Sequence, residues 1–223
     1  MLKVTNITKK YPKKIVLDPL SFEIERGEIV GLVGENGAGK STLLQILATT
    51  LKPTSGDIYF NEWSYQKYKS KIRRKIGFVP QDIAVWEELT VKENMVFFEK
   101  LAWENKSTSQ LQQICQDMHL DRWQDPVKNL SGGMKRKLNL AISFIHDPDL
   151  LLLDEPTVGI DLKSRKEIGA YLREQATTHN KTIIYTSHDM DEITALCDRI
   201  ITIGKDPFYK DLLKEAGKEV LSF

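Results

Sequence analysis

A glycine-rich turn between an apolar run and an amphipathic stretch constrains the fold of this chain more than any other feature. Residues 34–42 read Gly-Glu-Asn-Gly-Ala-Gly-Lys-Ser-Thr and match the pattern G-x-x-x-x-G-K-[ST]. Residues 29–33, just before the turn, form an apolar run whose length suits a buried strand. From residue 40 to residue 51 leucines recur at helical spacing, and Pro53 ends the pattern. A strand, a turn and a helix in this order are the context in which the pattern binds phosphate.

The residue types of this turn suit a polyphosphate. Glycines allow successive backbone N–H groups to point at one anion, and the start of the next helix adds the positive end of its dipole. The Lys40 ammonium is expected to reach the terminal phosphates, with about 1.5–3 kcal/mol from each charge-assisted hydrogen bond. The Ser41 hydroxyl is expected to bind Mg²⁺. The motif predicts these nucleotide-contacting residues: Asn36, Gly37, Ala38, Gly39, Lys40, Ser41 and Thr42.

Two other uses of a glycine-rich turn fit the sequence less well. A dinucleotide-binding fold would require G-x-G-x-x-G, but Thr42 stands where the third glycine belongs. Guanine-specific proteins with such a turn usually carry Asn-Lys-x-Asp, whereas the Asn-Lys pairs at residues 105–106 and 180–181 lack the aspartate. The sequence therefore favours an adenine nucleotide.

An acidic pair follows a second apolar run. Residues 150–153 are all leucine, which is typical of a central parallel strand, and Asp154 and Glu155 come directly after them. A carboxylate at the end of such a strand can lie near the Mg²⁺ on Ser41, so Asp154 is a predicted metal ligand. Glu155 is predicted to orient or deprotonate the water that attacks the γ-phosphate.

The remaining periodicity predicts an α/β chain with an inserted helical lobe. Alternating strands and helices favour a parallel sheet. Short segments broken by lysine and proline before residue 24 are typical of antiparallel strands. Further strands are expected at residues 76–79, 183–185 and 200–203, and a helix at 189–197. Three parts are predicted: 1–81 (antiparallel β and the first part of the core), 82–147 (inserted helical subdomain) and 148–223 (the rest of the core).

Composition excludes several classes of protein. The 32 basic and 31 acidic side chains leave a net charge of +1, which gives no bulk attraction to nucleic acid or anionic lipid. A hydrophobic fraction of 41% is ordinary for a globular protein. Cys115 and Cys197 lie in no metal-binding pattern and are expected to be reduced and packed inside. No leader or membrane-spanning run is evident, so work at a membrane would require another subunit.

Residues 130–136, Leu-Ser-Gly-Gly-Met-Lys-Arg, complete a set of motifs that resembles the nucleotide-binding subunits of ABC transporters. Glycine disfavours a helix by about 1 kcal/mol relative to alanine, whereas at a helix start it helps to bind an anion. The resemblance extends from Tyr11 to about Ile203. It implies a P-loop NTPase fold: a RecA-like, mostly parallel sheet with an N-terminal antiparallel β portion and an inserted α-helical subdomain that carries the signature.

The resemblance also implies roles for residues that would otherwise be read as packing, turn or helix-cap residues. Tyr11, with Val16 after it, is expected to contact adenine by stacking, which is worth roughly 1–3 kcal/mol. Gln81 is expected to approach Mg²⁺ and to link to a transmembrane partner, and His188 to contact the γ-phosphate. The residues expected to act across a head-to-tail dimer are Ser131, Gly132, Gly133 and Asp161.

Three features need separate interpretation. Met134 stands where the family most often has glutamine, and activity is expected to survive. Residues 204–207 lead to a short polar helix instead of a glycine-rich hairpin, so the final strands are expected to be shortened. Trp86 is expected either to contact a membrane subunit or to pack inside the helical lobe.

The resemblance implies an ATP-binding and ATP-hydrolysing subunit, with ATP and Mg²⁺ as cofactors, similar to the ABC-2 type exporter branch in residues 89–98. Its expected partners are a transmembrane permease and a second nucleotide-binding subunit, identical or not, at the cytoplasmic face of the membrane. The alternative is a soluble ABC ATPase that acts on ribosomes or DNA. Such relatives usually carry two cassettes or a coiled-coil insertion, so no nucleic acid partner is expected. A small P-loop kinase would leave the signature and His188 unexplained.

Overall fold

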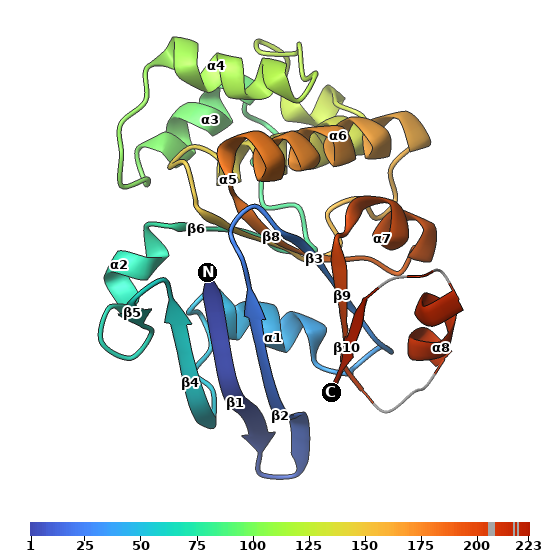
Figure 1. Ribbon diagram of the computed structural model, residues 1–223. Coiled ribbons are helices and arrows are strands. Elements are labelled where there is room, and N and C mark those ends of the chain that lie inside the picture. The colour runs from blue at the N-terminus through green and yellow to red at the C-terminus, as the bar shows by residue number, and fades with distance from the viewer. Residues whose placement is uncertain (205–207, 216, 218) are drawn as a thin grey trace.

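Two β-sheets and the helices around them make up the chain (Figure 1). The structure, a computed structural model, describes residues 1–204, 208–215, 217 and 219–223. An antiparallel sheet has the strand order β2-β1-β4-β5, with β1 (Leu2–Tyr11), β2 (Lys14–Ile24), β4 (Ser55–Phe60) and β5 (Trp63–Ser64). A parallel sheet has the order β10-β9-β3-β8-β7-β6, with β3 (Ile29–Val33), β6 (Ile76–Val79), β7 (Leu150–Leu153), β8 (Thr182–Thr186), β9 (Arg199–Thr202) and β10 (Val220–Ser222). The predicted α/β class is confirmed.

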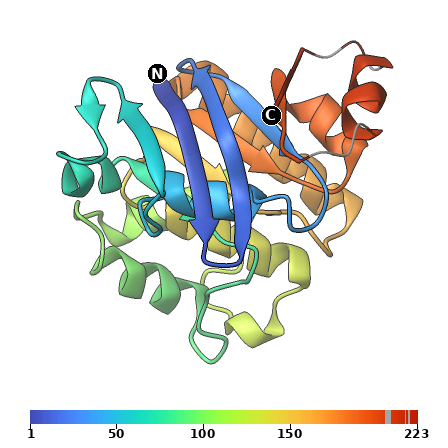
Figure 2. The same cartoon turned by 90° about the horizontal axis from the view of Figure 1, so that it is seen from below.

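Helices cover both faces of the parallel sheet. Helix α1 (Lys40–Leu47) lies between the two sheets, and Figure 2 shows β1 and β2 crossing over it. The other face carries α3 (Val91–Glu99), α4 (Thr108–Asp117), α5 (Gly132–Ser143) and α6 (Leu162–His179), with the short 3₁₀ helix η1 (Val127–Asn129) before α5. The remaining helices are α2 (Lys69–Arg73), α7 (Met190–Leu196) and α8 (Phe208–Glu215).

Two hydrophobic cores meet at the parallel sheet. Along β7, Leu150 and Leu152 belong to the core shared with α1 and the antiparallel sheet, whereas Leu151 and Leu153 belong to the core under α3 to α6. Successive side chains of a strand point to opposite faces, so one run of leucines serves both cores. Strands β3, β7 and β8 are buried at every position, which is typical of a parallel sheet covered on both sides.

Helix α1 ends at Leu47, before the predicted end at residue 51. Thr49 adopts a left-handed φ of 62°, and the Thr50 amide donates to the Gln45 carbonyl at 3.0 Å. This is the hydrogen-bond pattern of a Schellman helix end. The Arg73 guanidinium holds the turn by donating to the Thr49 hydroxyl at 2.6 Å. The leucine spacing continued beyond the helix because Leu51 still packs against the core.

The C-terminal part adds a strand that the sequence analysis did not predict. The expected short polar helix is found as α8, although residues 205–207 lie outside the described residues. Strand β10 then pairs in parallel with β9, with Val220 opposite Ile200. The sheet edge at β9 is therefore covered.

The structure also shows whether the two cysteines are buried and whether the described helices are long enough to cross a membrane. Both cysteines are buried as expected, and burial raises the pKa of the Cys115 thiol to about 12. Within the described part of the chain, none of the helices combines the length and apolar character needed to cross a lipid bilayer.

Candidate functional site

The glycine-rich turn connects β3 to α1 and is packed against β2. Gly39 precedes α1 with a φ of 105°, a backbone conformation that suits glycine. A Cβ atom there would lie 2.5 Å from Cδ2 of Leu17 and 2.7 Å from the Val16 carbonyl oxygen. The predicted contact residue Val16 therefore lies directly against the turn.

Lys40 curls back over the turn that precedes it. Its side chain is buried, and Nζ donates to the Gly34 carbonyl at 2.7 Å and to the Glu35 carbonyl at 3.1 Å. Burial lowers the pKa of Lys40, while the charges of Glu155, Asp154 and Glu35 oppose that shift. The ammonium thus stands among acceptors at the centre of the turn, where phosphate oxygens can take the place of the two carbonyls.

The acidic pair at the end of β7 is held by the neighbouring strand β8. The Thr186 hydroxyl donates to Oδ1 of Asp154 at 2.9 Å and accepts from the Glu155 amide at 2.8 Å. Both carboxylate residues are nearly buried, at 6% and 9% exposure. Thr186 was missed by the sequence analysis, because a single hydroxyl residue at a strand end gives no motif.

Three residues predicted from separate segments come together around Glu155. His188 Nε2 lies 2.7 Å from Oε1 of Glu155, and Gln81 Nε2 donates to Oε2 at 3.1 Å. These residues follow β8, β7 and β6, which are neighbours in the parallel sheet. Carboxyl ends of parallel strands lie at one edge, where α/β proteins bind ligands. Glu155 itself has a left-handed φ of 49°, which turns the chain sharply after β7.

Helix α5 fixes the segment after Gln81. The Arg136 guanidinium donates to the Gln81 carbonyl, and Asn139 Oδ1 accepts from the Ala84 amide at 3.3 Å. Burial lowers the pKa of Arg136. Neither Arg136 nor Asn139 was predicted as a site residue, although Arg136 lies within the quoted signature.

The signature residues begin α5. The Ser131 hydroxyl accepts from the Met134 amide at 3.3 Å and caps the helix, while Ser131 and Gly132 are exposed. A Cβ atom on Gly133 would lie 2.4 Å from the Ser164 hydroxyl oxygen, so this glycine also permits close packing on α6. Met134 packs against the core under α3 to α6.

Asp161 and Tyr11 lie at exposed positions. Asp161 caps α6, because its carboxylate accepts from the Ser164 amide at 2.9 Å and from the Ser164 hydroxyl at 2.8 Å. The first of these bonds lowers the pKa of Asp161. The Tyr11 ring is 48% exposed, and Lys9 Nζ lies 5.0 Å from its centroid, on one face. Because Asp161 accepts both hydrogen bonds from Ser164, it acts as a helix cap in the single chain, which is the alternative to a role in a dimer.

The side chains of Asp154 and Ser41 offer oxygen ligands of the kind that Mg²⁺ takes. Among the described residues, no group of three or more histidine, cysteine, aspartate or glutamate side chains could hold a metal ion. Mg²⁺ in nucleotide sites is bound by one or two protein oxygens together with phosphates and waters. A single carboxylate with a hydroxyl therefore fits that ion and does not amount to an all-protein metal cage.

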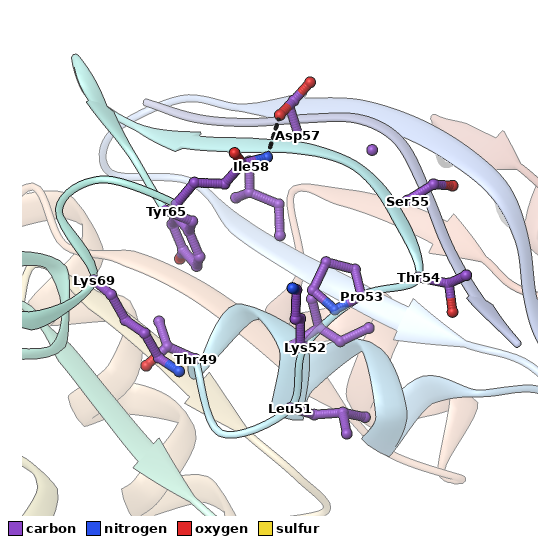
Figure 3. A pocket seen from close by; sticks show the side chains of 13 residues that line it. Thr49, Leu51, Lys52, Pro53, Thr54, Ser55, Asp57, Ile58, Tyr65 and Lys69 are labelled. Atoms are coloured by element: carbon purple, nitrogen blue, oxygen red, sulfur yellow. Dashed lines mark hydrogen bonds between the residues drawn. The ribbon is translucent and has the colours of Figure 1, made fainter. Parts of the chain in front are cut away.

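A pocket lies away from the glycine-rich turn. A pocket of about 570 Å³ opens between the end of α1, β4 and the segment before α2, and none of the predicted nucleotide-contacting residues lines it. Figure 3 shows Thr49, Lys52, Tyr65 and Lys69 around it. Among the lining residues, the Gln66 amide nitrogen donates to Oδ1 of Asp57 at 2.9 Å.

The phosphate turn, the acidic pair and the residues around Glu155 together are typical of a P-loop nucleotide-binding cassette. A family model described as ABC transporter matches residues 17–158. The chain belongs to the ABC transporter family, as the resemblance implied.

Curated relatives agree with this assignment. The chain is 39% identical over 203 residues to the linearmycin resistance ATP-binding protein LnrL of Bacillus subtilis (strain 168), covering 90% of this chain and 65% of that protein. It is 33% identical over 211 residues to the ABC transporter ATP-binding protein NatA of the same strain, covering 91% and 85%. It is 40% identical over 204 residues to Nod factor export ATP-binding protein I of Mesorhizobium japonicum (strain LMG 29417 / CECT 9101 / MAFF 303099), covering 89% and 59%. The chain thus spans less than two thirds of the length of the first and third of these relatives.

Solved structures share the fold over nearly the whole chain. The dimeric, post-hydrolysis cassette MJ0796 bound to ADP and Pi has a TM-score of 0.80 at 28% identity, covering 91% of this chain and 94% of that one. The protein cbiO1 from Clostridium perfringens, described as part of the ABC transporter complex cbiONQ, has a TM-score of 0.82 at 28% identity, covering 96% and 91%. The cassette fold that the sequence predicted is confirmed.

Proposed function

We propose that this chain binds and hydrolyses ATP to power an ABC exporter. The observation that carries the proposal is the convergence of Gln81 and His188 on the Glu155 carboxylate, at the same sheet edge as the Lys40 turn. Relatives named for linearmycin resistance and Nod factor export support the export branch. The three parts of the chain, 1–81, 82–147 and 148–223, then act as the lobes of one cassette.

The chemistry follows from the positions of these groups. The amides of the turn and the Lys40 ammonium bind the β- and γ-phosphates of ATP. Glu155 accepts a hydrogen bond from water and directs its oxygen at the γ-phosphorus, so that the bond to the β,γ-bridging oxygen breaks and ADP and phosphate form. His188, within reach of Glu155, contacts the γ-phosphate. Magnesium, held by Ser41, Asp154 and Gln81, supplies positive charge that offsets the charge of the phosphates.

A second cassette completes the site in this proposal. Ser131, Gly132 and Gly133 at the start of α5 contact the nucleotide of the other subunit. Two apolar side chains flank the Asp161 loop and are exposed in the single chain, Val158 at 45% and Leu162 at 65%. A paired surface would remove them from water, which favours head-to-tail association with a copy or a related subunit.

The permease is proposed to dock beside the segment that follows Gln81. Trp86 is 57% exposed and its ring lies 6.1 Å from that of Phe97, itself 40% exposed. Of the two expectations for Trp86, membrane-subunit contact is thus favoured over internal packing. Docking there would hold the chain at the cytoplasmic face of the membrane and link the permease to Gln81.

Lys40→Ala tests the nucleotide site. Loss of the ammonium is expected to weaken ATP binding roughly 10- to 100-fold, because a charge-assisted hydrogen bond is removed. Isothermal titration with ATP and Mg²⁺ measures the affinity, and a phosphate-release assay measures hydrolysis. The control Lys166→Ala removes an exposed lysine of α6 and should bind as the wild type does. Unchanged affinity in Lys40→Ala would contradict the assignment.

A further inference from the structure

A carboxylate on α7 is the common acceptor for three hydroxyl groups, one from strand β8 and two from the loops after β7 and β8. Glu192 accepts from the Tyr185 hydroxyl at 2.7 Å on Oε1, and from the hydroxyls of Ser187 at 2.7 Å and Thr157 at 2.9 Å on Oε2. Thr157, Tyr185 and Ser187 are all buried. None of these four residues belongs to the nucleotide site described above.

The charge of Glu192 suits this arrangement. An ionised carboxylate only accepts hydrogen bonds, so it can satisfy three hydroxyl donors at once. Burial raises the pKa of Tyr185, and the charge of Glu192 adds to that shift, so the phenol keeps its proton and remains a donor. Hydrogen bonds to a charged acceptor are stronger than those between neutral groups, above all where water is excluded.

Two of the hydroxyl groups come from the loops that matter for the proposed reaction, and the third, that of Tyr185, comes from β8. Thr157 lies two residues after Glu155 and two before Gly159, where the loop of Asp161 begins. Ser187 directly precedes His188. The Glu192 carboxylate therefore joins the loop after β7 to the loop after β8 through contacts separate from that between Glu155 and His188.

A second bridge joins the same two segments. Arg165, in the first turn of α6 after Asp161, forms an ion pair with Asp189, the residue after His188 and the cap of α7. Helices α6 and α7 both lie beside the parallel sheet, on the side away from β1 and β2 (Figure 1). The segment 158–164 is thus tied to the His188 loop at both of its ends.

We propose that Glu192 is a positioning residue that makes the His188 loop and the loop at residues 157–161 move as one unit. A displacement of His188 at the γ-phosphate is then passed to the loop that faces the second cassette. The inference rests on the proposed function for its meaning in the reaction, but the mechanical link exists in the chain without nucleotide.

Hydrogen exchange of the nucleotide-free protein tests the link directly. Glu192→Gln keeps the shape of the side chain but replaces one acceptor oxygen by a donor. Amides of residues 158–160 and 188–189 are expected to exchange together, about 10-fold faster than in the wild type, because loosened hydrogen bonds lower the free energy of local opening. Asp191→Asn removes a neighbouring charge from the first turn of the same helix and should leave both segments unchanged. Faster exchange in one segment alone, or in neither, would overturn the inference.

A matched pair at Thr157 guards against simple misfolding of the first variant. Thr157→Val removes the hydroxyl at similar volume and should raise the exchange rate in both segments. Thr157→Ser retains the hydroxyl and should keep the protection of both. Equal behaviour of the two variants would show that the hydroxyl bond to Glu192 is not the link.

Steady-state kinetics supply the second measurement. Glu192→Gln is expected to lower kcat for ATP about 10- to 100-fold through misplacement of His188, while KM stays within about twofold because the phosphate turn is untouched. Asp191→Asn should match the wild type. A change in KM alone would overturn the positioning role. Absence of hydrolysis in the wild type would refute the proposed function. The hydrogen-exchange rates of the two loops would then still show whether Glu192 couples them.

Discussion

Two glycines of the phosphate turn have left-handed backbones, but different constraints act on them. Gly39 has a φ of 105° and contacts Leu17 and Val16 so closely that no side chain fits. Gly37 has a φ of 82°, yet a Cβ atom there would meet nothing within 4 Å. Backbone strain therefore limits both positions, and steric exclusion limits only Gly39.

Alanine at each position should separate the two effects. Gly37→Ala is expected to lower the free energy of unfolding by about 1 kcal/mol, the cost of a left-handed alanine. Gly39→Ala adds overlap with Leu17 and Val16 and should lower it by about 3 kcal/mol. Urea denaturation of the two variants and the wild type measures the difference. Equal midpoints would mean that β2 moves away from the turn without cost.

Site residues were predictable where chemistry requires a fixed spacing along the chain. Lys40, Asp154 and Glu155 stand in such motifs, and the structure places them near one another. Thr186 and Glu192 escaped prediction because their contacts join segments 30 or more residues apart or depend on which hydroxyl faces which carboxylate. A hydrogen bond of this kind leaves no recognisable pattern in the amino-acid sequence. The roles proposed for Gln81, His188 and Ser131 came from family resemblance and remain predictions.

An ion pair joins the signature helix to its neighbour. Lys137 of α5 and Glu167 of α6 lie 2.5 Å apart, and their side chains are 5% and 22% exposed. Lys163 also approaches Glu167 at 3.9 Å but is 83% exposed. Removal of one partner from a buried pair leaves the other charge without compensation, whereas an exposed pair contributes little. Of the two lysines near Glu167, the buried Lys137 is therefore expected to contribute more to stability than the exposed Lys163.

Three substitutions rank these contributions. Glu167→Gln leaves the Lys137 charge without compensation and is expected to lower the free energy of unfolding by about 2 kcal/mol. The loss is smaller than for a fully buried pair, because water partly reaches these charges and screens them. Lys137→Met, which removes the buried charge and keeps an apolar stem, should cost about 1 kcal/mol or less. Lys163→Met should change stability by less than about 0.5 kcal/mol. Urea midpoints in the reverse order would contradict the burial argument.

Elements with strong periodicity were predictable, and those stabilised by tertiary contacts were not. The buried strands β3, β7 and β8 follow from apolar runs of the right length. The leucine spacing predicted a longer α1 than the structure has. The turn that ends this helix is held by Arg73, a residue far along the chain, and the spacing carries no information about that contact. Strand β10 has only three residues and exists through its pairing with β9, and the bounds of α6 were not predicted because polar residues dominate much of its length.

At the scale of the whole molecule, the residues proposed to act on ATP lie at one sheet edge, and part of the proposed site is uncovered. Lys40 follows β3 and Glu155 follows β7, with β8 between the two strands. Ser131 caps helix α5, and it is exposed together with Gly132 at the start of that helix. A nucleotide bound to the turn of one chain would therefore still lack a covering surface, which a second chain can supply.

Glu155→Gln should trap that paired state. Loss of the carboxylate is expected to lower ATP turnover by at least about 100-fold, while the turn and Lys40 still bind the nucleotide. With ATP and Mg²⁺ the variant should elute as a dimer in size exclusion with light scattering, and without ATP as a monomer. Normal turnover in the variant would remove Glu155 as the base, and a monomer in both conditions would remove the bridging role of the nucleotide.

The left-handed backbone at Glu155 has a consequence for the evolution of such a molecule. A residue with a side chain at a φ of 49° gives up about 1–2 kcal/mol that glycine would not. Unfolding relieves this strain, so the glutamate that we propose orients the attacking water also lowers the stability of the native state. Stability and activity therefore make opposite demands on this position. Selection for stability alone would be expected to replace Glu155 before other residues of the site.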